Sequence, residues 1–275
     1  MSPAFPPIRA CLFDMDGLLI NTEDLYTECA NIVLKKYGRP PLPWSIKAQL
    51  MGIPGSTNGD TFHNWAQLPI SREEFKQEQT EQQRIHFPEC QPLPGVELLL
   101  QQLKTARNTD GFPVQLALAT SSMKETFDMK TSGSAARALL EPMPPEHRVL
   151  GDDPRVQRGR GKPAPDIYLL ALKSINDSLP EGVSKITPAE CLVFEDSVLG
   201  VEAGRRAGMR TVWVPHPGLL TEYKGREPEV LAGRIGMLPI GNEEQLGEIG
   251  DGWAEQLVSL ENFPYERYGI VIQAA

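Results

Sequence analysis

Two aspartates stand two residues apart directly after an apolar run near the start of the chain. Residues 8–13 are mostly apolar, and Asp14 and Asp16 follow them, with Gly17 next. Side chains two apart on a strand point to the same side, so we expect the two carboxylates to lie together. Close carboxylates repel one another unless a cation lies between them, and Mg²⁺ prefers such oxygen ligands. The pair predicts a magnesium site, although two helix-capping aspartates would give the same pattern.

Three further groups have the chemistry of a phosphate site. Thr120 and Ser121 follow a second apolar run, Glu195 and Asp196 follow a third, and Lys162 lies in a glycine-rich loop between them. Hydroxyls and backbone N–H groups at a helix start can bind phosphate, and a lysine can neutralise it. Each group alone has an ordinary alternative, a helix cap or a solvated charge. Together, in this order, they favour a site in which Thr120, Ser121 and Lys162 bind phosphate.

These residues fit one reaction, the hydrolysis of a phosphate monoester. Asp14 would attack phosphorus and form an aspartyl phosphate, which water then cleaves. Asp16, protonated when substrate is bound, would donate a proton to the leaving alkoxide and later accept one from water, a role worth about 10²–10⁴ in rate. Mg²⁺ and Lys162 would offset charge on the phosphoryl oxygens. The sequence predicts a Mg²⁺-dependent phosphomonoester hydrolase with Asp14 and Asp16 as catalytic residues.

The elements that must position these residues alternate between strand and helix. Apolar runs at 8–13, 114–119, 191–194 and 211–214 have the length and continuity of strands buried on both faces, and 147–150 is a weaker fifth candidate. Helix signals separate them, among them Pro165 and the potential cap Ser197. This order predicts an α/β fold, a doubly wound Rossmann-like core with a parallel sheet.

The segment after the first strand has a different pattern. Residues 22–91 contain no strand-like run, and Ser71 to Glu74 form a capping box before a polar helix. We therefore predict a Rossmann-like core at 1–21 and 92–240 with a helical cap at 22–91. The remaining 241–275 form a C-terminal extension of unknown role, with one helix expected from Trp253 to Leu260.

Composition excludes several classes of protein. The chain has 275 residues, a formal charge of −9 and no basic block, which argues against nucleic-acid binding. The four cysteines show no CxxC spacing, and no apolar stretch is long enough for a signal peptide or a membrane span. The four histidines make no metal-ligand pattern. We expect a cytoplasmic monomer whose partner is a small phosphorylated metabolite.

Four segments also resemble the motifs of a known family. They are residues 13–17 (FDMDG), 119–122 (ATSS), 161–163 (GKP) and 194–197 (FEDS). Together they resemble the four motifs of the haloacid dehalogenase superfamily, and the place of the helical insertion is similar to that of its C1-cap subclass. Within the superfamily, residues 12–19, 127–132 and 149–154 are most similar to the pseudouridine-5'-phosphatases.

The resemblance implies a metal site and a substrate class. The Mg²⁺ ligands would be the carboxylate of Asp14, the backbone carbonyl of Asp16 and Asp196, with Glu195 beside them, directly or through water. The substrate would be pseudouridine 5'-phosphate, or else a glycerol phosphate or deoxyhexose phosphate. A phosphosugar mutase shares every catalytic residue. A phospho-acceptor signalling domain or a non-catalytic binding module is the alternative from a different class.

Three residues near the cap hinge are candidates for substrate specificity. Glu23 follows the nucleophile loop, and Met51 and Gly52 lie in a turn of the predicted cap. The leaving group would meet them when the cap closes over the site. For Glu23 and Met51, helix capping and packing are the alternative roles.

Overall fold

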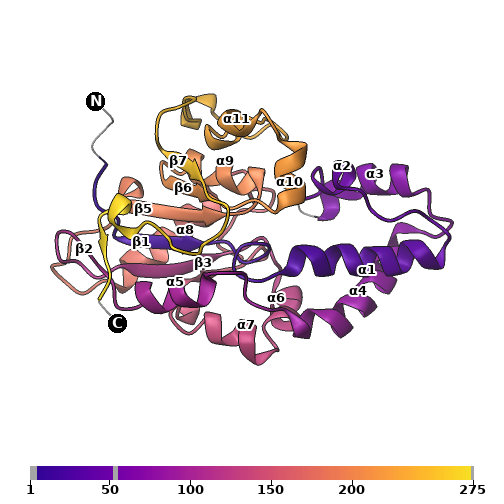
Figure 1. Cartoon of the computed structure of the whole chain (residues 1–275), viewed down its shortest axis with the longest axis horizontal. Coiled ribbons are helices and arrows are strands. Elements are labelled where there is room, and N and C mark those ends of the chain that lie inside the picture. The colour runs from indigo at the N-terminus through magenta and orange to yellow at the C-terminus, as the bar shows by residue number, and fades with distance from the viewer. Residues whose placement is uncertain (1–4, 52–54, 274–275) are drawn as a thin grey trace.

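A six-stranded parallel sheet lies at the centre of the molecule (Figure 1). The computed structural model describes residues 5–51 and 55–273. The strand order β4-β3-β1-β5-β6-β7 places β1 in the interior, and each neighbouring pair is parallel. A second, two-stranded sheet pairs β2 with β8 antiparallel. The strands of the described chain are β1 (Ala10–Phe13), β2 (Arg107–Asn108), β3 (Gln115–Ala119), β4 (Arg148–Val149), β5 (Cys191–Glu195), β6 (Arg210–Trp213), β7 (Ala254–Gln256) and β8 (Ile270–Val271).

Helices lie on both sides of the sheet and beyond one end of it (Figure 1). They are α1 (Thr22–Lys36), α2 (Trp44–Lys47), α3 (Gly55–Ala66), α4 (Arg72–His86), α5 (Val96–Leu103), α6 (Lys124–Lys130), α7 (Ser134–Leu139), α8 (Asp166–Ser178), α9 (Val198–Arg206), α10 (Pro217–Glu222) and α11 (Glu227–Leu231). Short 3₁₀ helices are η1 (Phe87–Glu89), η2 (Pro145–His147), η3 (Pro188–Glu190), η4 (Glu243–Gln245) and η5 (Tyr265–Tyr268). No helix in the described ranges is long and apolar enough to cross a membrane.

Alternate residues of β1 face the two sides of the sheet. Ala10 and Leu12 pack in an apolar cluster with residues of α8 and α9. Cys11 and Phe13 pack in a second cluster with residues of α5 and of the C-terminal segment. A strand buried on both faces has no polar side, which is why it appears in the sequence as a continuous apolar run. The prediction of a doubly wound α/β fold is confirmed.

Local signals set the ends of two of the predicted helices. The Ser197 hydroxyl accepts a hydrogen bond from the Gly200 N–H at 3.1 Å and caps α9. Gly208, which follows α9, has φ of +71°, a conformation that side chains rarely tolerate. At α4, Ser71 and Glu74 exchange the two hydrogen bonds of a capping box, as predicted.

The segment between α1 and α4 forms an all-helical unit in its described part (Figure 1). It has an apolar cluster of its own, made by side chains of three helices: Val33, Leu34, Phe62, Ala66 and Phe75. The chain enters this unit at Asn21 and leaves it at Gln91, and the Asn21 N–H donates to the Gln91 carbonyl at 3.0 Å. The two connections to the sheet therefore lie side by side.

The predicted helix from Trp253 to Leu260 is wrong. Ala254–Gln256 form β7, which pairs parallel with β6, so that Trp213 stands opposite Gln256. Gly250 and Gly252 both have positive φ, which interrupts any helix immediately before this segment. The edge of β6 offers hydrogen-bond partners to the backbone N–H and C=O groups of this segment. A single isolated helical turn would satisfy fewer of these groups. Tertiary pairing overrides the weak local helical pattern.

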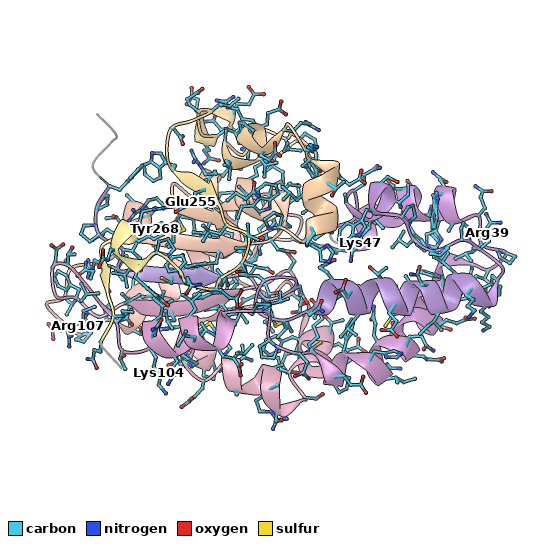
Figure 2. All side chains as sticks on the ribbon, viewed as in Figure 1. Arg39, Lys47, Lys104, Arg107, Glu255 and Tyr268 are labelled. Atoms are coloured by element: carbon cyan, nitrogen blue, oxygen red, sulfur yellow. The ribbon has the colours of Figure 1, made fainter. Side chains whose placement is uncertain are left out.

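The rest of the C-terminal segment packs against the apolar residues that precede the acidic residues at the ends of β1 and β5. Phe263 lies 5.3 Å from the Phe194 ring, and Phe194 stacks on Phe13 at 4.5 Å. Tyr268 stacks on Phe263 at 5.2 Å and donates to the Glu255 carboxylate. Figure 2 shows the side chains of Tyr268 and Glu255 close together. Since Phe13 and Phe194 immediately precede Asp14 and Glu195, the extension supports the floor of the site.

Truncating Phe263 should therefore destabilise the whole core. Phe263→Ala removes a buried ring from this stack, and we expect the free energy of unfolding to fall by about 3–5 kcal/mol in urea denaturation. Val258→Ala is the matched control in the same segment. Val258 is 94% exposed, so its truncation should change stability by less than about 0.5 kcal/mol. Similar small changes for both variants would show that the extension is not part of the core.

Candidate active site

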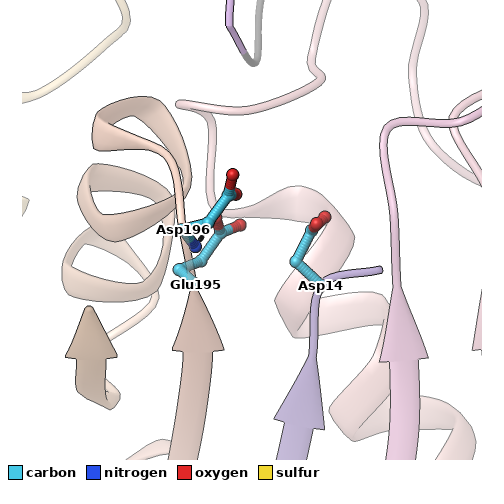
Figure 3. Close-up of side chains that lie close together, drawn as sticks. All are labelled: Asp14, Glu195 and Asp196. Atoms are coloured by element: carbon cyan, nitrogen blue, oxygen red, sulfur yellow. Dashed lines mark hydrogen bonds between the residues drawn. The ribbon is translucent and has the colours of Figure 1, made fainter. Parts of the chain in front are cut away.

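Three carboxylates converge at the carboxyl ends of β1 and β5. Asp14 follows β1, Glu195 ends β5 and Asp196 comes next, and all three are buried. Figure 3 shows them directed toward one another, and each offers an oxygen within 4.8 Å of the others. Parallel pairing brings them together, because β1 and β5 are neighbours in register, with Phe13 opposite Phe194.

Lys162 joins two of these carboxylates. Its Nζ lies 2.5 Å from Asp14 Oδ1 and 2.5 Å from Glu195 Oε1, and only 3% of the residue is exposed. Burial raises the pKa of Asp14 to about 7. The charge of Lys162 lowers this pKa, but the charges of Glu195 and Asp16 raise it further. A buried carboxylate in this environment favours a bound cation.

Both oxygens of Glu195 already have protein donors. Oε1 also accepts from the Tyr168 hydroxyl at 2.6 Å, and Oε2 accepts from the backbone N–H groups of Asp196 and Ser197 and from the Ser197 hydroxyl at 3.1–3.2 Å. Such a saturated carboxylate holds Lys162 in place. It has little capacity left for direct metal coordination.

Asp196 has the opposite character. Its Oδ2 is buried and makes no hydrogen bond within the described chain. Burial, together with the charges of Glu195 and Asp14, raises its pKa well above the ordinary value. A Cβ on Gly17, which has φ of +74°, would lie 2.3 Å from this oxygen, so only glycine fits there. A buried, unpartnered carboxylate oxygen beside Asp14 fits a divalent cation.

The Asp16 carboxylate takes part in a separate network. Oδ1 accepts from the Thr22 hydroxyl at 2.7 Å and from Lys130, and Oδ2 accepts from the Ser122 hydroxyl at 2.6 Å. Burial opposes ionisation of Asp16, but the charge of Lys130 and these hydrogen bonds outweigh it, so its pKa lies below the ordinary value. The backbone carbonyl of Asp16 accepts no hydrogen bond from the described residues and is available to a metal.

The two hydroxyl residues predicted to bind phosphate differ in their surroundings. Thr120 is fully buried; its N–H donates to the Val149 carbonyl at 3.0 Å, and its hydroxyl lies 3.4 Å from Asp16 Oδ2. Ser121 is exposed, and its N–H and hydroxyl make no hydrogen bond to the described part of the chain. Ser121 therefore has donors free for an oxyanion.

Of the residues predicted to set substrate specificity, Glu23 lies at the site and Met51 has a packing role. Glu23 lies against the nucleophile loop, since its Cγ is 2.8 Å from where a Cβ on Gly17 would stand. It pairs with the buried Lys47 of α2 at 2.9 Å, and Figure 2 shows Lys47 on the side of the helical unit that faces the sheet. Met51 is buried among residues such as Trp213, which is a packing role. Gly52 lies outside the described residues.

Sequence reasoning did not find Lys130, Ser122 or Tyr168. Ser122 is adjacent to Ser121, so the helix-start pattern could have included it. Lys130 follows the buried Phe127 by three residues on α6, and a lysine on the apolar side of a short helix is a signal for a buried partner. Tyr168 is part of an ordinary apolar helix pattern, and nothing in the sequence marks its hydroxyl.

Known proteins are similar to this chain in sequence and in fold. The model of the family described as haloacid dehalogenase-like hydrolase matches residues 11–214. A "probable pseudouridine-5'-phosphatase" of Saccharomyces cerevisiae is 42% identical over 211 residues, 76% of this chain and 84% of that protein. The (DL)-glycerol-3-phosphatase 1 of Arabidopsis thaliana is 34% identical over 234 residues, 84% of this chain and 72% of that protein. A solved haloacid dehalogenase-like protein of unknown function from Agrobacterium tumefaciens has the same fold, with a TM-score of 0.62 at 19% identity, covering 94% of this chain and 97% of that one.

The fold, the strand-end carboxylates and these relatives together define a hydrolase of phosphate monoesters. The chain belongs to the haloacid dehalogenase-like hydrolases. The resemblance noted in its four sequence segments is thereby confirmed, and so is the prediction of a phosphoric monoester hydrolase.

Proposed function

We propose that the chain is a Mg²⁺-dependent phosphatase of a small phosphorylated metabolite that works through an aspartyl phosphate on Asp14. The observation that carries this proposal is that Asp14, which is bridged by Lys162, lies beside a buried oxygen of Asp196 that has no hydrogen-bond partner among the described residues. Asp14, Asp196 and the backbone carbonyl of Asp16 would hold the Mg²⁺, and Glu195 would act through Lys162 or through water. When bound, Mg²⁺ supplies positive charge that lowers repulsion between the nucleophile and the phosphate.

The protein groups divide the remaining work. Asp14 attacks phosphorus, and Lys162 keeps that carboxylate oriented while its charge stabilises the phosphoryl oxygens. Ser121 donates to a phosphoryl oxygen, and Thr120 fixes the backbone of the same loop. Asp16 is ionised before substrate binds, since its pKa lies below the ordinary value. It would take up the proton of the phosphate monoanion on binding, give that proton to the leaving alkoxide and then take one from the attacking water.

Chelation tests the metal part of this proposal. EDTA should remove phosphate release completely, and Mg²⁺ should restore it. Ca²⁺ should bind but inhibit, because its larger and more flexible coordination sphere can draw in both oxygens of Asp14 and block attack. Full activity in EDTA, or equal activity with Ca²⁺, would contradict a catalytic Mg²⁺ at this site.

We propose pseudouridine 5'-phosphate as substrate and the helical unit at 22–91 as the cap. The proposal is supported by the yeast relative and by the paired connections at Asn21 and Gln91, which would serve as a common hinge for the unit. A cap of this kind admits a monophosphate and excludes a phosphoprotein. A glycerol phosphate is the second candidate because of the Arabidopsis relative. The four cysteines are buried free thiols, which fits a reducing compartment such as the cytoplasm.

A panel of monophosphates decides between these substrates. We expect kcat/KM to be highest for pseudouridine 5'-phosphate, ahead of glycerol 3-phosphate, uridine 5'-phosphate and a deoxyhexose phosphate. A lower value for pseudouridine 5'-phosphate than for glycerol 3-phosphate or uridine 5'-phosphate would reject the substrate and leave the phosphatase activity intact. An isomerised sugar phosphate without phosphate release would instead indicate a mutase.

Glu23 should affect the leaving group and not the phosphoryl transfer itself. In Glu23→Gln the amide keeps the shape and still offers Lys47 an oxygen, but the charge at the nucleophile loop is lost. We expect KM for the preferred substrate to rise about tenfold, because the loss of a hydrogen bond to a charged group weakens binding by about that factor. Cleavage of p-nitrophenyl phosphate should not change. Glu28→Gln, an exposed position on the same helix, is the control. Equal losses on both substrates would assign Glu23 to packing.

A further inference from the structure

Lys130 is a buried cation for which the proposed mechanism has no use. It ends α6, has no exposed surface, and lies over the rings of Tyr26 and Phe87 at 4.7 and 5.2 Å. A lysine in such surroundings needs hydrogen-bond acceptors for all of its donors. Its Nζ donates to Asp16 Oδ1, to the Ser122 hydroxyl at 2.8 Å and to the Tyr26 hydroxyl at 2.9 Å.

These contacts exclude one role and favour another. An ammonium group has three N–H donors, and Lys130 has three acceptors within the protein. No donor is left for a substrate, so Lys130 cannot bind the phosphate as Lys162 does. One of these acceptors is Asp16, and a second, Ser122, itself donates to Asp16. Lys130 therefore holds the Asp16 carboxylate both directly and through Ser122.

The two oxygens of Asp16 are held differently. Oδ1 has two close donors, Thr22 and Lys130. Oδ2 has one close donor, Ser122 at 2.6 Å, and the Thr120 hydroxyl at 3.4 Å, too long for a strong bond. The one acceptor position that remains weakly occupied is therefore on Oδ2, beside the loop expected to bind phosphate.

We propose that Lys130 is the positioning residue of Asp16: it fixes Oδ1 and Ser122 so that Oδ2 is the oxygen that exchanges the proton with the leaving group and with water. The proposal rests on the phosphatase function stated above. Without the ammonium, the carboxylate can rotate about its bond to Cβ, and Oδ2 is no longer held toward the reacting atoms. A purely structural lysine would only balance the buried charge of Asp16.

The experiment compares leaving groups. In Lys130→Met the side chain keeps its length between Tyr26 and Phe87 but loses its donors. We expect kcat/KM for glycerol 3-phosphate and pseudouridine 5'-phosphate to fall about 10²-fold, the contribution of a positioned acid. For p-nitrophenyl phosphate, whose leaving group needs little protonation, we expect kcat/KM to change less than about threefold. Lys124→Met, an exposed lysine at the start of the same helix, should change neither.

A second pair of variants separates positioning from folding. The variant Asp16→Asn/Lys130→Met contains no unpaired buried charge, so it can fold even where the single lysine variant does not. If Lys130 acts only through Asp16, the double variant should cleave the alkyl phosphates no more slowly than Asp16→Asn alone. A further loss in the double variant, or equal losses on alkyl and aryl phosphates in Lys130→Met, would overturn the proposal. Wild-type protein that cleaves none of the three phosphates would instead reject the phosphatase function itself.

Discussion

Asp14→Asn protein should release no phosphate from any substrate, while it stays folded. An amide cannot attack phosphorus, so the aspartyl phosphate cannot form, and the metal site loses a charged ligand. We expect kcat with p-nitrophenyl phosphate in saturating Mg²⁺ to fall by at least about 10⁴-fold, as for other catalytic nucleophiles. An aryl phosphate is the sharpest probe because its good leaving group makes the reaction least dependent on Asp16. Substantial Mg²⁺-dependent turnover by this variant would reject Asp14 as the nucleophile.

The stability of wild-type protein relative to the same variant has a predictable pH dependence in the metal-free state. Burial raises the pKa of Asp14 to about 7 in the folded protein, above its value in the unfolded chain. A carboxyl group shifted in this direction favours folding when it is protonated, and that contribution is lost as the pH rises through about 7. In EDTA, wild-type protein should therefore lose stability relative to Asp14→Asn as the pH rises from about 4, the ordinary pKa of an aspartate, to about 7, as followed by urea denaturation. The opposite trend would show that Lys162 and not burial dominates at Asp14.

The sequence was most informative where burial on both faces left a continuous apolar run. β1, β3 and β5 lie in the interior of the sheet, and each coincides closely with a predicted strand. Their neighbouring carboxyl ends then bring Asp14 beside Glu195 and Asp196. β7 was missed because an edge strand of three residues, Ala254–Gln256, has no alternation or apolar run to mark it. Only the unpaired edge of β6 explains why that segment is extended.

The site shows the same division between local pattern and tertiary contact. Asp14 and Lys162 are 148 positions apart, yet each follows a recognisable signal, a strand end and a glycine-rich loop. Lys130 has no such signal, since its importance depends on Asp16 lying at the end of another element, 114 positions earlier. Nor does the sequence separate Glu195 from Asp196. The structure does, because Glu195 has five protein donors, whereas one oxygen of Asp196 has no donor among the described residues.

Lys162→Met should lower both activity and stability, and the two effects can be separated. The variant leaves Asp14 and the fully buried Glu195 without their shared cation. Removing one partner of a buried ion pair costs about 3–5 kcal/mol, so the metal-free protein should unfold at a clearly lower urea concentration. Loss of a charge that stabilises the transferring phosphoryl group should lower kcat/KM for p-nitrophenyl phosphate by about 10²–10³-fold in saturating Mg²⁺.

A second substitution tests whether these two losses have different causes. Lys162→Met/Glu195→Gln removes the uncompensated charge of Glu195, so it should recover part of the lost stability. It should recover none of the activity, because the phosphoryl oxygens still lack the cation. Arg160→Met is the control in the same loop, since Arg160 forms a partly exposed pair with Asp166, which is worth at most about 1 kcal/mol. Activity that returned together with stability in the double variant would mean that Lys162 only neutralises Glu195 and takes no part in phosphoryl transfer.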